Sequence, residues 1–277
     1  MKKIKKKEIR TIIYTNICIV IMILVVLILT IVYKYIAYKK EVQASLETSV
    51  NVEELYNTTK TEEADINGEE NEKDVDSNIS DWELLLVNKN HKIPEGYSVE
   101  LEEVEKTHKV DKRITESLKQ MLSDARKEGL SPIICSSYRT NAKQQKLYNN
   151  KVTQYKKWGY SSEEAKELAS YWVAIPGTGE HETGLAVDIV SKNYQILDEK
   201  QEETAEQKWL IENSYKYGFV LRYPTNKKDI TMINYEPWHY RYVGIDNATY
   251  MKEHDMCLEE YIDYLKQFEE EEYKELV

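Results

Sequence analysis

Two short stretches, Pro176-Gly-Thr-Gly-Glu-His-Glu-Thr-Gly-Leu-Ala-Val-Asp188 and Glu236-Pro-Trp-His239, decide the expected fold because their side chains have to meet in space. Together they offer two imidazoles, from His181 and His239, and one carboxylate, from Asp188. Two histidines and one aspartate can bind a tetrahedral zinc ion and leave its fourth position open for water. The two stretches therefore predict a zinc site.

The local sequence indicates how each side chain would be aimed at that site. Glycines around His181 allow a tight backbone turn that brings its ring beside Asp188. Asp188 lies in an apolar strand pattern, where burial of a carboxylate is costly unless it is paired or bound to a metal. The alternative to a metal-binding role is that Asp188 pairs with an arginine or caps a turn. Pro237 restricts Glu236 to extended backbone, and a bend there would turn Glu236 and His239 toward one site. Glu236 is not needed as a ligand and suits the general base of a zinc hydrolase.

The charge of the chain is distributed unevenly. The formal net charge of −11 argues against nucleic acid as the main partner, because binding to phosphates requires basic patches. Residues 1–40 carry nine basic side chains and one acidic one, whereas residues 41–81 carry 13 acidic side chains and two lysines. Residues 1–40 therefore form a basic segment, and residues 41–81 form an acidic one.

An apolar, uncharged run from Ile12 to Tyr33 lies within the basic segment. Its length suffices for a helix that spans about 30 Å of hydrocarbon. The flanking basic residues favour a cytoplasmic N-terminus and an exported remainder. We predict a basic cytoplasmic tail at 1–11 and a transmembrane anchor at 12–36. A cleavable signal peptide is the alternative, with Val42-Gln-Ala-Ser45 as a weak cleavage site.

Residues 37–81 are rich in acidic and small polar side chains. Such a segment cannot bury enough apolar area to offset chain entropy, so a disordered linker is expected. The globular domain is expected to extend over 82–277. Its predicted strands and helices are interspersed without regular βαβ spacing, which favours an α+β fold. The strands are expected at 82–87, 132–136, 185–190 and 219–223, and the helices at 113–127, after Thr140, at 161–172, 204–217 and 258–273.

The three cysteines of the chain form no recognisable disulfide framework. Cys135 lies in an apolar strand pattern and is expected to be a small core residue. A disulfide between Cys135 and Cys257 remains open. The three histidines in polar stretches are expected to be ordinary polar residues: His91, His108 and His254.

Arg139 stands between a predicted strand and a predicted helix. This position projects its guanidinium over a cleft, where it can hold a carboxylate bidentately. A plain surface salt bridge is the alternative. If Arg139 faces the zinc site, the carboxylate would be that of a substrate.

These motifs resemble the zinc D-Ala-D-Ala carboxypeptidases of the VanY type, within the peptidase M15 family. The larger fold group also contains lysostaphin-type peptidases and the hedgehog signalling domain. The resemblance covers about 82–245 and implies a small α+β zinc peptidase domain with a central antiparallel sheet. It rests on Leu85-Leu-Val-Asn-Lys89, Ser137-Tyr-Arg-Thr140 with Gln144 and Leu147-Tyr148, Pro176–Asp188, and Glu236-Pro-Trp-His-Tyr-Arg241.

The resemblance implies a role for each matching residue. The zinc ligands would be His181, Asp188 and His239. Glu236 would be the base that activates the attacking water and passes its proton to the leaving amine. Substrate would be bound by Arg139 and Gln144, which would anchor its terminal carboxylate or the adjacent backbone, and by Ser137, Tyr138 and Trp238.

The expected activity is that of a membrane-anchored, extracytoplasmic D,D-carboxypeptidase that removes the terminal D-Ala of peptidoglycan stem peptides. The chain departs from the family at Gly179, where a serine is common. This difference affects the expected substrate preference. Three alternatives remain: an L,D-carboxypeptidase acting on tetrapeptides, a zinc-containing module that only binds cell-wall peptides, and a structural ectodomain. The richness in Lys, Ile, Asn, Glu and Tyr fits a Gram-positive bacterium.

Overall fold

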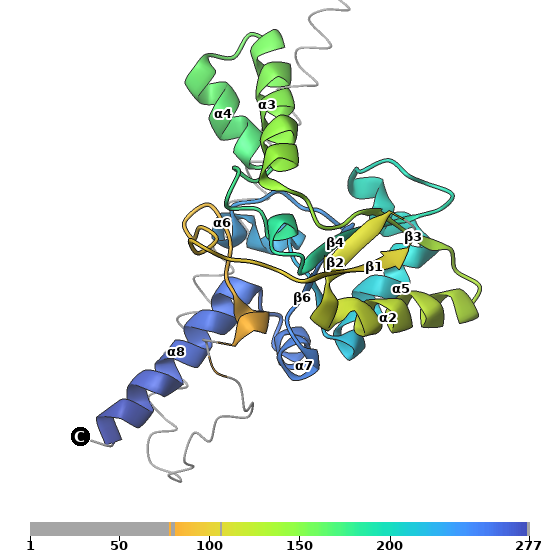
Figure 1. Cartoon of the computed structure of the whole chain (residues 1–277), viewed down its shortest axis with the longest axis vertical. Coiled ribbons are helices and arrows are strands. Elements are labelled where there is room, and N and C mark those ends of the chain that lie inside the picture. The colour runs from red at the N-terminus through yellow and green to blue at the C-terminus, as the bar shows by residue number, and fades with distance from the viewer. Residues whose placement is uncertain (1–77, 79–80, 106, 276–277) are drawn as a thin grey trace, which may run out of the picture. The chain divides into compact units, whose positions relative to one another are not determined.

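The computed structural model describes residues 78, 81–105 and 107–275 (Figure 1). They all belong to one compact unit, Glu72–Val277. The predicted tail at 1–11, the anchor at 12–36 and nearly all of the linker at 37–81 lie outside these residues. Within the part of the chain that the structure describes, no helix has the length and apolar character to cross a membrane.

A four-stranded antiparallel sheet forms the centre of the domain, with the strand order β3-β4-β6-β5. The strands are β3 (Pro132–Ser136), β4 (Ala186–Ser191), β5 (Phe219–Leu221) and β6 (His239–Tyr242). All six residues of β4 are buried, because the strand lies between two others and both of its faces are covered. The sheet confirms the predicted α+β fold with a central antiparallel sheet.

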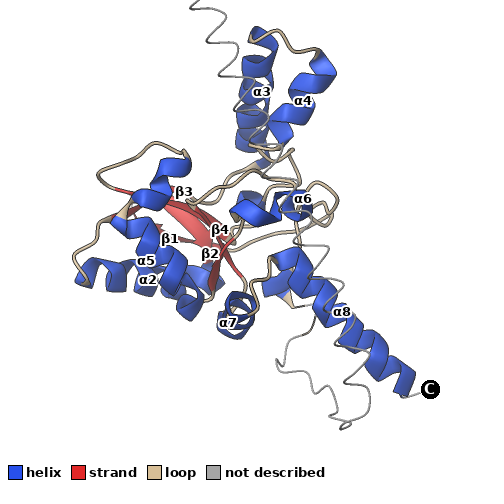
Figure 2. Cartoon of the chain, turned by 180° about the vertical axis from the view of Figure 1, so that it is seen from behind, coloured by secondary structure: helices blue, strands red, loops and turns tan. Residues whose placement is uncertain are grey.

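The two faces of the sheet differ in character because side chains alternate along each strand. One face carries Val187, Ile189 and Tyr240, which belong to the main hydrophobic core. Helices α2 (Thr115–Lys127) and α5 (Ala205–Asn213) cover this face (Figure 2). The opposite face carries the polar residues Asp188 and His239, so the core on one face supports the site on the other.

Helices α3 (Asn141–Lys157) and α4 (Ser162–Ser170) form a hairpin that projects beyond one end of the sheet (Figures 1 and 2). Thr140 caps α3 by accepting a hydrogen bond from the backbone N–H of Lys143. Ser161 and Glu164 form a capping box at the start of α4. The two helices pack through a small apolar cluster formed by Val152, Ala165 and Ala169. Helix α4 ends two residues before the predicted end.

A second apolar cluster lies at the other end of the domain. It includes Leu84, Val243, Met251 and Leu265. Helices α7 (Ile245–Glu253) and α8 (Leu258–Glu275) contribute most of its residues. The predicted C-terminal helix is therefore confirmed, and its apolar stripe packs against α7 and β5.

Two of the predictions from sequence were wrong. Residues 82–87 form no strand; Trp82–Leu84 is a short 3-10 turn, and Leu84 and Val87 are buried by packing alone. A short apolar run cannot distinguish a buried strand from a buried turn. Cys135 is exposed; it lies in the edge strand β3, where the pairing with β4 is irregular between Ile134 and Ser136, and both Cys135 and Cys257 are free.

Two strands and two α-helices have no counterpart among the predictions. They are β1 (Leu101–Glu105) and β2 (His108–Asp111), which form a polar hairpin, the short helix α6 (Lys228–Thr231), and α7. The hairpin carries several charged residues and thus lacks the apolar alternation by which strands are recognised.

Candidate active site and metal centre

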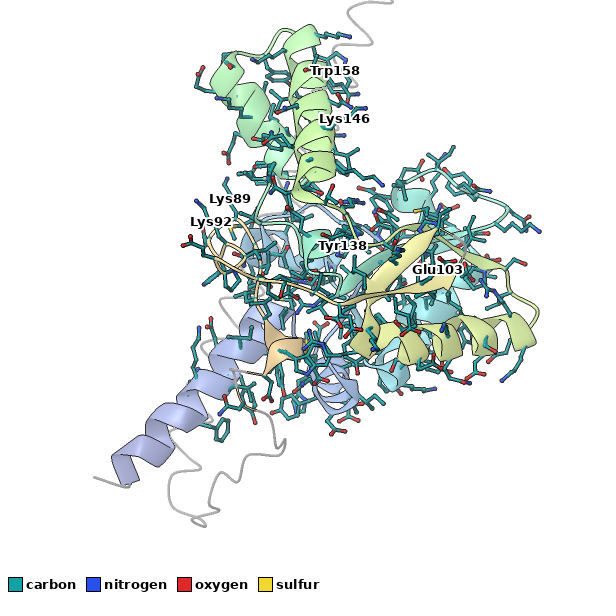
Figure 3. All side chains as sticks on the ribbon, viewed as in Figure 1. Lys89, Lys92, Glu103, Tyr138, Lys146 and Trp158 are labelled. Carbon is teal, nitrogen blue, oxygen red and sulfur yellow. The ribbon has the colours of Figure 1, made fainter. Side chains whose placement is uncertain are left out.

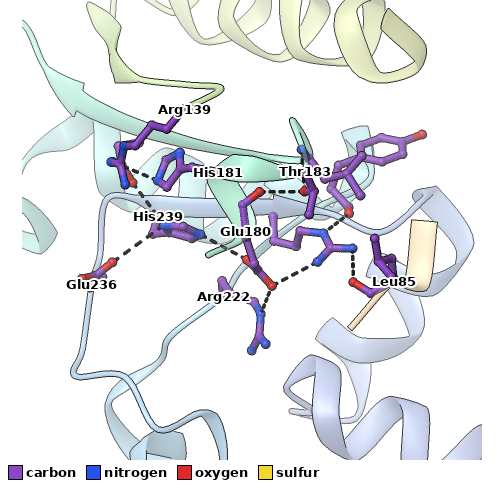
Figure 4. A network of polar contacts seen from close by, with 12 residues as sticks. Leu85, Arg139, Glu180, His181, Thr183, Arg222, Glu236 and His239 are labelled. Carbon is purple, nitrogen blue, oxygen red and sulfur yellow. Dashed lines mark hydrogen bonds and ion pairs between the residues drawn. The ribbon is translucent and has the colours of Figure 1, made fainter. Parts of the chain in front are cut away.

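The three predicted metal ligands come together on the polar face of the sheet (Figure 4). His181 is presented by the 3-10 turn Glu180–Glu182, Asp188 by β4 and His239 by β6. Asp188 and His239 are directly opposite each other in the antiparallel register of β4 and β6. One ligand atom from each of the three lies within 4.8 Å of the others, and all three residues are buried.

Hydrogen bonds on the far side of each ring orient the two imidazoles. His181 Nδ1 lies 2.9 Å from the carbonyl oxygen of Ser137, to which it can donate. His239 Nε2 lies 3.2 Å from Glu180 Oε2. These partners leave His181 Nε2 and His239 Nδ1 facing Asp188, each 3.2 Å from one of its oxygens. Histidine ligands of metals are typically held this way by a carbonyl or carboxylate behind the ring.

Asp188 provides a test of whether the site fits a metal ion. Its Oδ1 atom is buried without a hydrogen-bond partner among the described residues; His239 Nδ1, although 3.2 Å away, lacks hydrogen-bond geometry. A buried, unpaired carboxylate oxygen is costly. Two imidazole nitrogens and one carboxylate oxygen are the ligand set of a zinc site with a fourth position free for substrate or water. The residues therefore fit zinc.

The charges around the ligands favour an ionised carboxylate. Burial opposes ionisation of Asp188, but His181, His239 and Arg139 hold its pKa well below the usual range. Burial and Arg139 lower the pKa of His181 to about 4, so its imidazole is neutral, as metal binding requires. Burial also disfavours the charged form of His239, but the carboxylates of Asp188 and Glu180 beside the ring raise its pKa to about 9.

Glu236 lies at the edge of the ligand cluster, with its Oε2 3.7 Å from His239 Nδ1. The bend expected at Pro237 is present: the N–H of His239 donates to the carbonyl of Glu236, which brings the two side chains to the same side. Burial raises the pKa of Glu236 to about 8, and the charge of Asp188 adds to this rise. A divalent cation beside the carboxylate would oppose the rise.

A cavity of about 380 Å³ opens beside the ligands. Arg139, Gln144 and Trp238 line it, as does Glu236. The Nη2 of Arg139 lies 2.7 Å from Asp188 Oδ2, and its Nη1 lies 3.5 Å from the amide oxygen of Gln144. The guanidinium therefore lies between the metal ligands and the open part of the cavity, where it can reach a bound carboxylate.

The structure does not bring Ser137 and Tyr138 to this cavity. Ser137 is buried, and it acts through its carbonyl, which fixes the ring of His181. Tyr138 lies in the loop between β3 and α3 (Figure 3), and its N–H donates to the carbonyl of Lys109. The contact of these two side chains with substrate stays a prediction.

A buried network of charges behind His239 was not predicted from the sequence. Glu180 Oε1 accepts hydrogen bonds from Arg222 Nε (2.7 Å) and Arg241 Nη1 (3.0 Å). Arg222 also forms a bidentate pair with Glu259 of α8, at 2.7 and 2.8 Å. Arg241 donates to the carbonyls of Glu83 and Leu85 (Figure 4). One signal was available in the sequence: His239 and Arg241 are two residues apart, so in a strand their side chains point to the same face.

This network gives Glu180 two functions. It holds His239 in orientation and it balances two fully buried arginines, which in turn keep the pKa of Glu180 well below its usual range despite burial. Removing one partner of a buried ion pair typically costs 3–5 kcal/mol. Loss of the residue that orients a metal-bound histidine typically weakens metal affinity 10- to 100-fold.

We therefore expect Glu180→Gln to lower the free energy of unfolding by about 3 kcal/mol and zinc affinity by at least about tenfold. Urea denaturation and competition with a chelator measure the two effects. The control is Glu167→Gln, which breaks an exposed pair with Lys89 (2.8 Å) and should cost below about 1 kcal/mol. Equal losses of stability and of zinc affinity in the two variants would contradict the role assigned to Glu180.

Gly179 also lines the cavity, and the structure indicates that a serine fits there. Its φ of −102° suits any residue. An added Cβ would lie 3.4 Å from Ala174 Cβ and from the side chains of Gln144 and Glu182, which is ordinary contact. We expect Gly179→Ser to fold with a stability change below about 1 kcal/mol. Its hydroxyl should lower KM a few-fold by adding one hydrogen bond to substrate.

Steady-state kinetics and thermal unfolding test this expectation. Gly184→Ser is the contrasting variant, because Gly184 has a φ of +81° and its added Cβ would meet the backbone nitrogen of Asp111 at 2.9 Å. It should therefore destabilise the domain. An unfolded Gly179→Ser protein would contradict the geometry of the turn.

Comparison with known proteins agrees with the geometry. A family model described as VanY: D-alanyl-D-alanine carboxypeptidase matches residues 107–245. A D-alanyl-D-alanine carboxypeptidase of Enterococcus faecalis (strain ATCC 700802 / V583) is 46% identical over 183 residues, which are 66% of this chain and 66% of that relative. The chain thus spans about two thirds of the length of this curated relative.

The chain is similar to several solved structures, including these two. One is a mutant of the vancomycin resistance D,D-pentapeptidase VanY from a VanB-type resistance cassette, in complex with Zn(II). It is 46% identical with a TM-score of 0.61, over 66% of this chain and 99% of that one. The other is the LdcB LD-carboxypeptidase, 39% identical with a TM-score of 0.55, over 64% of this chain and 84% of that one.

Proposed function

Because this chain belongs to the VanY family of D-alanyl-D-alanine carboxypeptidases, we propose that it is a zinc enzyme that removes the C-terminal D-Ala from peptidoglycan stem peptides. The observation that carries the proposal is the grouping of side chains on one cavity. The ligand set of His181, Asp188 and His239 lies beside a buried carboxylate at Glu236 and a guanidinium at Arg139. A module that only binds peptides would not need the carboxylate.

The side chains divide the reaction among them. His181, Asp188 and His239 would hold the zinc ion, which when bound there would lower the pKa of a water molecule and polarise the scissile carbonyl. Glu236 accepts the proton of the attacking water and returns it to the departing amine of D-Ala. Arg139 and Gln144 hold the terminal carboxylate of the peptide, so the last peptide bond is the one placed at the ligands. The result is removal of a single C-terminal residue.

The similarity to an LD-carboxypeptidase favours a second candidate activity. In this activity the chain hydrolyses the bond between an L-configured residue and the C-terminal D-Ala of a stem tetrapeptide. The test is incubation of the purified full-length chain with a stem pentapeptide ending in D-Ala-D-Ala and with the matching tetrapeptide. Mass spectrometry measures D-Ala release from each. Faster release from the pentapeptide supports the D,D-activity, faster release from the tetrapeptide supports the L,D-activity, and no release from either contradicts both.

The place of action proposed is the outer face of the cytoplasmic membrane of a Gram-positive bacterium. The support is the sequence alone: the apolar run within 12–36, its basic flanks and the acidic linker at 37–81. Fractionation of cells and protease treatment of intact protoplasts test it. Membrane-bound protein whose C-terminal domain is digested from outside is expected. Protein found only in the soluble cell extract would contradict the proposal.

A further inference from the structure

The cavity extends beyond the metal ligands along helix α3. Its lining includes Gln144, Leu147, Lys151 and Gln154, which follow one another at intervals of three or four residues and therefore share one helix face. The mechanism uses only the first of these residues. The remaining stretch of the cavity wall has no role in holding the metal or the terminal carboxylate, so it is available to the part of the substrate upstream of the scissile bond.

Lys151 is the distinctive residue of this stretch. The other charged side chains that line the cavity have charged partners: Arg139 pairs with Asp188, Glu180 with two arginines, and Glu236 with His239. In the described part of the chain, Lys151 Nζ has neither an ion pair nor a hydrogen bond. Its Nζ lies over the ring of Trp172, 5.2 Å from the ring centre. A half-buried cation of this kind is suited to an anionic ligand.

The surroundings favour an anion in the same place. Helix α3 carries five lysines and no acidic residue, within a chain of net charge −11. Burial lowers the pKa of Lys151, with Glu236 acting in the opposite direction, so the ammonium lacks full stabilisation until an anion binds. The indole of Trp172 faces the cavity beside it and offers a flat apolar surface to the peptide chain.

The position of Lys151 indicates which part of the substrate it meets. It follows Gln144 by seven residues on the same helix face, a rise of about 10 Å. Gln144 and Arg139 mark the place of the terminal carboxylate. An extended peptide advances about 3.3 Å per residue, so about three residues separate the two places. In a stem pentapeptide these are the third residue and the γ-linked glutamate before it, both of which can carry a free carboxylate branch.

We propose that Lys151 and Trp172 form a subsite for a carboxylate on the substrate, located about three residues upstream of its C-terminus. The inference rests on the proposed function and names the substrate class within it. Peptides with a free carboxylate at the γ-linked glutamate or at the third residue would bind more tightly than the amidated forms. The subsite is thus separate from the one formed by Arg139 and Gln144.

The test compares Lys151→Met, which keeps the side-chain stem but removes the charge, with the unchanged full-length enzyme. Four pentapeptides are used, in which the glutamate and the third residue each carry either a carboxylate or a carboxamide. We expect KM to rise about tenfold for the two peptides that carry the recognised carboxylate and kcat to stay within about twofold. The position at which amidation removes the effect identifies the source of the carboxylate. Lys151→Arg should retain the preference.

Lys146→Met is the matched control, because Lys146 is an exposed lysine of the same helix (Figure 3) and does not line the cavity. It should leave all four KM values unchanged. An equal rise of KM for all four peptides in Lys151→Met would overturn the proposal, because the lysine would then act on Glu236 or on the terminal carboxylate. No change for any peptide would overturn it as well.

A binding measurement separates failure of the subsite from failure of the proposed reaction. Calorimetry with zinc-loaded Glu236→Gln protein reports peptide affinity without turnover. The proposal requires about tenfold tighter binding of one carboxylate peptide than of its amidated form, and loss of this difference when Lys151→Met is added. Equal affinities would overturn it, whether or not the unchanged enzyme releases D-Ala.

Discussion

Replacement of Glu236 by glutamine is expected to lower kcat for D-Ala release roughly a thousandfold while the chain still binds one zinc ion. Glutamine keeps the size of the side chain but cannot accept the proton of the attacking water. The metal content should persist because Glu236, although its Oε2 lies 3.7 Å from His239 Nδ1, does not belong to the group of three residues whose ligand atoms all lie within 4.8 Å of one another. Mass spectrometry of the products and elemental analysis of the protein measure the two quantities.

Glu206→Gln is the matched control. Glu206 is also buried, but it lies outside the cavity and accepts a hydrogen bond from the backbone N–H of Ser131, which a glutamine oxygen can also accept. It should retain activity. Unchanged turnover in Glu236→Gln would reject Glu236 as the base, and loss of zinc would make it a ligand instead.

Replacement of His239 by alanine is expected to remove both the metal and the activity. It deletes one of the three ligands, and the pair left by His181 and Asp188 cannot hold zinc tightly. Because the metal contributes several kcal/mol to the stabilisation of charge in the transition state, activity should fall by at least about a thousandfold. Zinc content and D-Ala release measure the result.

The domain should stay folded in this variant, since Glu180 keeps its bonds to Arg222 and Arg241. His91→Ala is the control, because His91 is exposed and its ring contacts only Asn88 among the described residues. It should keep full zinc content. Stoichiometric zinc in His239→Ala protein would contradict the ligand assignment.

The ligand set was predictable because each of its residues stands in an unusual sequence context. Asp188 interrupts an apolar strand, and a turn rich in glycine precedes it. The strands at β3, β4 and β5 were predictable for a related reason, since buried strands consist of short apolar runs between turn residues. The structure adds the register that places Asp188 opposite His239.

The charge network behind the site was not predictable from sequence. Charged residues such as Glu180, Arg222 and Glu259 usually lie at the protein surface. Here they are buried because they form ion pairs with one another. The pairs join positions 42 and 37 residues apart. No local pattern encodes such a pairing, because it depends on where β5 and α8 meet the turn that holds Glu180. Lys151 was missed similarly: helix α3 is rich in lysine, and only the cavity distinguishes this lysine from the others.

The central claim is that His181, Asp188 and His239 hold a catalytic zinc ion in a carboxypeptidase that removes one C-terminal D-Ala. The most direct measurement is D-Ala release from a stem pentapeptide by the full-length chain as purified, after chelation, and after zinc is returned. We predict release of one D-Ala per peptide, its loss on chelation and its recovery with zinc. Release that persists after chelation, or no release from protein that carries one zinc per chain, would contradict the claim.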